Sequence, residues 1–153
     1  MQKQFDIKLF PAVLKFRVRS YEIDFQNVVN NAVYFNYFEM GRIDYRKQMG
    51  VKMYPNGSFS DGLLFFVVKN SCEYYEPCSI DDEITLYTRI AFIKNSSFGF
   101  EQVLFNNSSG KFAAFGSDVI VNVDYKTRQR AVIPEGLIDE IKKFDSNVKI
   151  TRG

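Results

Sequence analysis

Apolar and polar residues alternate in five separate stretches of the chain, and this pattern predicts a β-sheet. In the first stretch Leu14, Phe16 and Val18 alternate with basic residues, which is the period of two expected of a half-buried strand. Further strands are predicted at residues 63–75, 84–92, 98–105 and 111–124. Short turn-rich segments separate these later strands, so the sheet is predicted to be antiparallel.

A helical period replaces the alternation after Asn30. Apolar residues recur at spacings of four, three and four, at Tyr34, Phe38, Gly41 and Tyr45. The polar stripe is narrower and consists of Asn36, Glu39, Arg42 and Arg46. A helix that is apolar over most of its circumference is expected to be enclosed, so the sheet is predicted to curve around it. Gly50 is a suitable C-terminal cap, and Pro134 opens a second, shorter helix. The expected architecture is α+β, with residues 1–153 as one domain.

Composition narrows the range of functions. The chain has 153 residues, 46% of them apolar, with sixteen Phe, nine Tyr and a net charge of only +2. Many Phe residues are compatible with an aromatic core or with an apolar ligand tunnel, and the mild charge gives no reason to expect nucleic-acid binding. No apolar run is long enough to span a membrane or to form a signal peptide, so a soluble, cytoplasmic protein is expected. Cys72 and Cys78 are then expected to be free thiols.

The absence of histidine is also informative. Hydrolysis by a Ser-His-Asp triad or a Cys-His pair is excluded, because both need an imidazole as the base. The nine glycines form no phosphate loop and no dinucleotide-binding fingerprint.

The segment from Ser20 to Tyr45 carries the strongest candidate chemistry. Asp24 ends a strand-like stretch and is followed closely by the predicted start of the long helix. A carboxylate at this place lies beside unpaired backbone N–H groups and the positive end of the helix dipole. This combination can hold and attack a polarised carbonyl group. On spacing alone, a turn or capping role for Asp24 is equally open.

A wider set of residues in this segment follows a known family pattern. The matching positions are Tyr21, Glu22, Asp24, Val28, Val29, Asn30, Asn31 and Tyr34, continued by Tyr37, Phe38, Glu39 and Arg42. A second block comprises Tyr75, Glu76 and Pro77 followed by Asp82 and Glu83. In these residues the chain resembles the hotdog-fold acyl-CoA thioesterases, the group around 4-hydroxybenzoyl-CoA thioesterase. The resemblance covers most of the chain and is looser after about residue 95.

The chain departs from the family pattern at two neighbouring positions. Asn27 stands where the family usually has glycine, and Val28 stands where many members have histidine. Asparagine tolerates a positive φ better than most residues, so the turn after Asp24 is expected to survive.

The resemblance implies a fold and an activity. The fold would be a hotdog, with about five strands wrapped around one long helix. The activity would be hydrolysis of an acyl thioester of coenzyme A or acyl carrier protein, with Asp24 as nucleophile or general base and backbone N–H groups near Asn31 and Ala32 as oxyanion donors. The implied substrate-binding residues are Val29, Asn30, Asn31, Tyr34 and Glu39. No metal and no cofactor beyond the substrate's own pantetheine arm is expected. The dehydratases of this fold need a histidine, which this chain lacks.

Several alternatives stay open at this stage. Glu39 is expected to form an ion pair with Arg42 on the helix surface, with a pocket role as the alternative. Asn30 and Asn31 are helix caps that could also line the site. The candidate cations for coenzyme A phosphates are Lys15, Arg17, Arg19, Arg128 and Arg130. The family implies a homodimer or homotetramer formed through sheet edges. The rival function is a non-catalytic domain that binds acyl thioesters.

Overall fold

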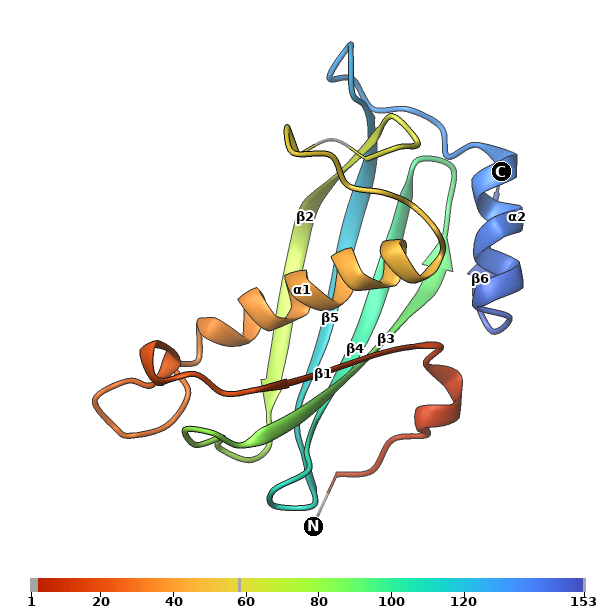
Figure 1. Ribbon diagram of the computed structural model, residues 1–153. Helices are drawn as coiled ribbons and strands as arrows, with labels where there is room; N and C mark the ends of the chain where they lie inside the picture. Colours follow the sequence, from red (N-terminus) through yellow and green to blue (C-terminus); the bar gives the residue numbers. More distant parts are fainter. Residues whose placement is uncertain (1–2, 58, 153) are drawn as a thin grey trace.

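One antiparallel sheet carries a long helix across one of its faces (Figure 1). The computed structural model describes residues 3–57 and 59–152, and within them the sheet has six strands. The strands are β1 (Ala12–Arg17), β2 (Leu63–Tyr74), β3 (Glu83–Ile93), β4 (Ser97–Asn106), β5 (Lys111–Asp124) and β6 (Lys149–Ile150). The helices are α1 (Val33–Gln48) and α2 (Glu135–Phe144), with short 3₁₀ turns η1 (Ile7–Leu9) and η2 (Ser20–Glu22).

The strand order is β1-β3-β4-β5-β2, and every neighbouring pair in this order is antiparallel. The five strands and two helices expected from the sequence are therefore confirmed. The sequence pattern did not predict β6, a two-residue strand that pairs parallel with β3. A curved sheet around one long central helix is the hotdog architecture. Neither helix of the described residues has the length and apolarity that crossing a membrane would require.

The apolar stripe of α1 forms the centre of the core. Its four predicted members and Tyr37 are all buried. They pack on side chains of β1, β3, β4 and β5, among them Phe16, Ile84 and Leu104. The helix ends as expected, with Gly50 at a φ of +94°.

The polar stripe of α1 differs from its prediction at Arg46. This residue belongs to the polar stripe, yet only 4% of its surface is exposed. Its guanidinium lies under the rings of Phe59 and Phe65 and pairs with Asp61. These partners come from the loop after α1 and from β2, so spacing within the helix could not reveal them.

A second apolar cluster closes the far end of the sheet, where α2 packs (Figure 1). Ile138 and Ile141 of α2 belong to it, with Tyr45 from α1 and Ile90 from β3. The buried Asp145 follows α2 and joins these elements, because its Oδ2 accepts hydrogen bonds from the Tyr45 hydroxyl (3.0 Å) and the Ile90 N–H (2.8 Å). The C-terminal end of α1 is thereby fixed, while its N-terminal end faces the loop that carries Asp24.

Candidate active site

The loop that carries Asp24 is a tight reversal between two bridged residues. Ile23 and Val29 pair as an isolated antiparallel bridge, and the half-buried Asp24 is the first residue inside the loop. Its Oδ1 accepts a hydrogen bond from the Gln26 N–H (2.8 Å). Asn27 adopts a φ of +66°, which confirms that asparagine replaces the family's glycine without loss of the turn.

The turn that leads into α1 presents an unengaged backbone donor at Asn31. Asn30 caps the turn before the helix, because its Oδ1 accepts a hydrogen bond from the Ala32 N–H (3.0 Å). The Asn31 carbonyl accepts a hydrogen bond from the Tyr74 hydroxyl (2.7 Å). No hydrogen bond among the described residues uses the Asn31 N–H. Of the two expected oxyanion donors, Asn31 is therefore available and Ala32 is occupied.

A cavity of about 270 Å³ opens beside this helix start, and we call it the helix-start cavity. Its lining residues are Val29, Asn31, Tyr34, Tyr74, Tyr75, Glu76 and Pro77. Three of the predicted site residues thus line one hollow, and Asp24 and Asn30 lie in the adjoining loop. Burial raises the pKa of Tyr34, so its hydroxyl is a neutral donor.

Glu22 holds the loop against α1, a role that the sequence reasoning missed. The side chain is 5% exposed and accepts hydrogen bonds from the Arg19 N–H (2.7 Å), the Arg19 guanidinium (2.8 Å) and the Tyr37 hydroxyl (2.9 Å). Burial opposes its charge, but these hydrogen bonds outweigh burial and lower the pKa of Glu22. The i, i+3 spacing of Arg19 and Glu22 was a readable signal of an ion pair between their side chains.

Glu22→Gln is expected to lower the free energy of unfolding at neutral pH by about 1–3 kcal/mol, because the amide NH₂ would face the donors of Arg19. A group with a lowered folded-state pKa contributes stability above its ordinary pKa and loses it as the pH falls. The difference between wild type and variant should therefore shrink in acid. Denaturant titrations at a series of pH values measure this, and a difference that grows below neutral pH would contradict it.

Glu39 lies apart from the other predicted site residues. It lines a separate cavity of about 350 Å³ between α1, β2 and the loop after α1, which we call the helix-side cavity. The expected ion pair between Glu39 and Arg42 is wrong, because Arg42 instead pairs with Asp118 of β5 (3.3 Å). Asp118 also accepts a hydrogen bond from the Phe100 N–H (2.8 Å), and burial raises the pKa of Asp118 to about 6.

Asp118 should give the protein a measurable pH dependence of stability. Its folded-state pKa is above the ordinary value of 3.8, so the folded state holds the proton more tightly than the unfolded state. The Asp118 contribution to the free energy of unfolding should fall as the pH rises from about 4 to about 6. Asp118→Asn removes this contribution, so the difference in free energy of unfolding between wild type and variant should decrease as the pH rises over that window in chemical denaturation. Parallel profiles for wild type and variant would contradict the assignment.

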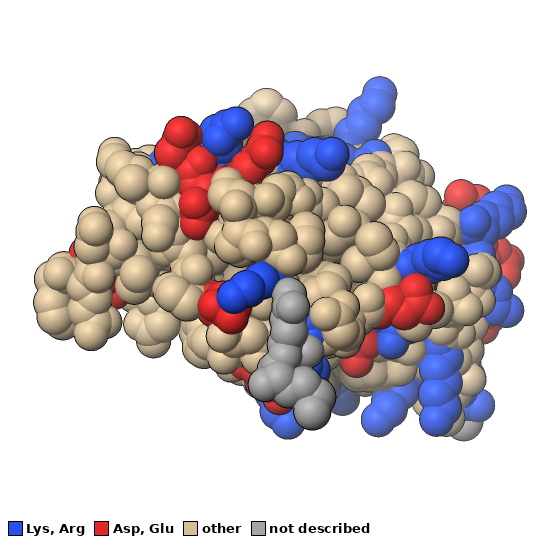
Figure 2. Space-filling view, turned by 90° about the horizontal axis from the view of Figure 1, so that it is seen from below, with Lys and Arg blue, Asp and Glu red and all other residues tan. Residues whose placement is uncertain are grey.

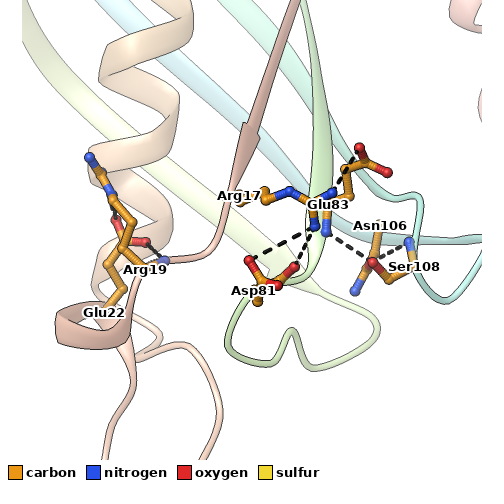
Figure 3. A network of polar contacts seen from close by, with 7 residues as sticks. All are labelled: Arg17, Arg19, Glu22, Asp81, Glu83, Asn106 and Ser108. Atoms are coloured by element: carbon orange, nitrogen blue, oxygen red, sulfur yellow. Dashed lines mark hydrogen bonds and ion pairs between the residues drawn. The ribbon is translucent and has the colours of Figure 1, made fainter.

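Two of the candidate cations for coenzyme A phosphates are engaged in ion pairs (Figure 3). Arg17 contacts Asp81 and Glu83, and Arg19 contacts Glu22. Figure 2 shows Lys and Arg interspersed with Asp and Glu, while the end on the side of the loop before α1 is largely uncharged. Tyr21 and Phe25 belong to that loop region and are 72% and 96% exposed. The other three candidates, Lys15, Arg128 and Arg130, form no ion pair within the part of the chain that the structure describes.

Comparison with known proteins agrees with this architecture. The chain is 27% identical over 133 residues to the long-chain acyl-CoA thioesterase FadM of Escherichia coli, covering 87% of this chain and 96% of that protein. It is 29% identical over 115 residues to the acyl-acyl carrier protein thioesterase ATL2 of Arabidopsis thaliana, covering 74% of this chain and 60% of that protein.

Among solved structures, a thioesterase from Thermus thermophilus complexed with coenzyme A and Zn is similar, with a TM-score of 0.77 and 27% identity. The similarity covers 91% of this chain and 97% of that one. The family model of the thioesterase-like superfamily matches residues 18–141, which include the Asp24 loop, α1 and all of β2 to β5. The chain is therefore a thioester hydrolase of the thioesterase-like superfamily.

Proposed function

We propose that the chain hydrolyses acyl thioesters of coenzyme A or acyl carrier protein, with Asp24 as the catalytic carboxylate. The observation that carries this proposal is the helix start, where the Asp24 loop adjoins a cavity and the unengaged Asn31 N–H. A thioester carbonyl bound there would have a carboxylate on one side and a backbone donor on the other. The helix dipole would add to the stabilisation of an oxyanion at that donor.

Two routes are open to this carboxylate. As a general base, Asp24 takes a proton from water, the resulting hydroxide adds to the carbonyl carbon, and the tetrahedral intermediate expels the thiolate, which is then protonated. As a nucleophile, Asp24 forms a mixed anhydride while the thiolate leaves, and water then hydrolyses the anhydride. A single turnover in heavy-oxygen water distinguishes the two routes. Only the nucleophilic route can place the label in the Asp24 carboxylate, which happens when water attacks the Asp24 carbonyl carbon of the anhydride.

The first test is thiol release from a panel of acyl-CoA and acyl-carrier-protein thioesters. FadM and ATL2 are named for these two substrate classes, so both belong in the panel, with aromatic and aliphatic acyl groups. Turnover of at least one thioester is expected, without added metal or cofactor. Binding without turnover across the whole panel would instead favour a non-catalytic acyl-thioester-binding domain.

We further propose that the chain works as a homodimer, or as a homotetramer built from such dimers. β2 lies at the edge of the sheet, and among the described residues its only strand partner is β5. Phe66, Val67 and Val68 on this strand are 42–61% exposed. A long apolar edge strand is a liability in a monomer. Tyr74, at the end of the same strand, lines the helix-start cavity, so a partner on β2 would border the site.

Val68→Lys should shift the protein toward monomer, because an unpaired charge in a β-edge interface opposes association. The dimer dissociation constant should rise by about tenfold or more, a cost of roughly 1.4 kcal/mol or above. Light scattering after size exclusion measures the change. Val132→Lys is the matched control, since Val132 is 65% exposed and lies outside every strand. Equal behaviour of the two variants would rule out the β2 edge.

A further inference from the structure

The buried Arg46 separates two hollows along α1. Its guanidinium makes hydrogen bonds of 2.8 and 2.7 Å with both carboxylate oxygens of Asp61. It also lies 3.5 Å from the ring centre of Phe59 and 3.9 Å from that of Phe65. The guanidinium is thus held on several sides, by two rings and a carboxylate, with its side chain 5% exposed.

On one side of Arg46 lies the helix-side cavity. Its walls are mainly apolar and include Ile43, Leu64, Phe100 and Ile120, with Glu39 and Arg42 toward the N-terminal end of the helix. Arg46 follows Glu39 by two helical turns, about 10 Å further along the axis. The volume of about 350 Å³ falls within the range of small-molecule pockets.

On the other side lies a second hollow of about 330 Å³ beneath α2, with walls that include Met49, Val51, Leu63 and Leu137. Asp61, the partner of Arg46, lines this second hollow. A small gap of about 10 Å³ lies between the helix-side cavity and the second hollow. Arg46 and Phe65 line both this gap and the helix-side cavity. Met49 and Val51 line both this gap and the second hollow. Arg46 and its partners therefore stand at the boundary between two apolar spaces.

Packing alone does not account for a charged pair at this position. Burying a guanidinium is costly, and apolar residues of similar volume usually stabilise a core as well or better. An apolar side chain at residue 46 would also leave the two hollows easier to connect, because it would lack the two hydrogen bonds by which the Arg46 Nη2 holds both Asp61 oxygens.

We propose that the Arg46–Asp61 pair is a partition that limits the length of the acyl chain. This inference rests on the proposed thioesterase activity. The helix-start cavity and the helix-side cavity share no lining residue, so an acyl chain attached at the helix start would have to cross the stretch along α1 between Asn31 and Glu39, about 12 Å. It would then enter the helix-side cavity and end at Arg46. Without the guanidinium, a longer chain would pass Phe65 and occupy the hollow beneath α2. Arg46 is then a specificity-determining residue, remote from the reacting atoms.

The test compares chain-length profiles of wild type, Arg46→Ala and Arg46→Met, using saturated acyl-CoAs from butanoyl to stearoyl. Each additional buried methylene is worth about fourfold in affinity. The ratio of kcat/KM for long over short chains should therefore rise by about tenfold or more in Arg46→Ala. Arg46→Met keeps the unbranched stem and should show a smaller shift in the same direction. Lys47→Ala, an exposed cation on the next position of α1, should leave the profile unchanged.

Circular dichroism confirms that each variant is folded, and Arg46→Met serves if Arg46→Ala is not. A folded Arg46 variant with the wild-type profile would overturn the partition. If no thioester is hydrolysed by any form, the proposed activity fails, and the partition is tested by binding of free fatty acids. Palmitate should then raise the melting temperature of the Arg46 variant more than that of wild type, whereas equal shifts would overturn the inference.

Discussion

Asp24→Asn is expected to lower kcat for thioester hydrolysis by about two to four orders of magnitude, the usual contribution of a positioned base or nucleophile. The amide cannot accept a proton from water and is a poor nucleophile. The fold should survive, because the Asn Oδ1 can still accept the hydrogen bond that the Asp24 Oδ1 accepts from the Gln26 N–H (2.8 Å). KM should change little, because the loss falls on the transition state and not on binding of the substrate in its ground state. Steady-state kinetics on the best substrate of the panel measures both constants.

Asp124→Asn is a matched control for this experiment. Asp124 ends β5, and its Oδ1 accepts hydrogen bonds from the Lys126 and Thr127 N–H groups in a turn of similar kind. The same substitution there should leave kcat unchanged. If Asp24→Asn retains wild-type activity while both variants stay folded, Asp24 is a turn-capping residue and the proposed mechanism is wrong. A loss of activity in both variants would indicate a general effect of altered turns.

The sequence predicted those parts of the fold whose signal is local. The alternation at residues 111–124 matches β5 at both ends, and the apolar stripe of α1 is buried as expected. The strand β6 was missed because two residues carry no periodicity. Its pairing with β3 depends on where α2 delivers the chain.

In the candidate site, too, the features with a local signal were predictable and those that depend on distant residues were not. The positive φ of Asn27 was predictable from residue type, and the place of Asp24 before α1 followed from spacing. The partners of Arg42 and Arg46 could not be predicted from the sequence. Asp118 lies 76 residues from Arg42 in the chain, and the partners of Arg46 come from a loop and a strand. An i, i+3 spacing favours Glu39 as the partner of Arg42. The buried Asp118 lies 3.3 Å from the Arg42 guanidinium, and the attraction between these two charges is little screened by water, although burial itself is costly to both.

α1 approaches the sheet closely at Gly41, and this contact limits where the helix can lie. A Cβ at this residue would lie 2.5 Å from the Gln102 Nε2, 2.7 Å from the Leu86 Cδ2 and 2.8 Å from the Thr88 Oγ1. All three side chains are fully buried. The Gln102 amide is further fixed by its hydrogen bonds to the Phe38 carbonyl (2.8 Å) and the Thr88 hydroxyl (3.1 Å). The neighbours of Gly41 therefore have little room to withdraw.

Gly41→Ala is accordingly expected to lower the free energy of unfolding by about 2–4 kcal/mol, from overpacking and from the strained or broken Gln102 hydrogen bonds. The gain in helix propensity, about 1 kcal/mol, offsets only part of this. The melting temperature should fall by roughly 5–15 °C for a chain of this size. Activity at low temperature should also fall, because any lift of α1 moves the Asn31 N–H relative to Asp24.

Gly136→Ala provides the control for helix propensity. Gly136 lies in α2, and a Cβ there would have no heavy atom within 4 Å. The substitution should therefore be neutral or stabilising by up to about 1 kcal/mol. If the two Gly→Ala substitutions change the free energy of unfolding in opposite directions, the close contact at Gly41, and not the loss of a glycine as such, determines how α1 packs on the sheet. If Gly41→Ala were as stable as wild type, the helix would have room to move, and the geometry at the helix start could not depend on this contact.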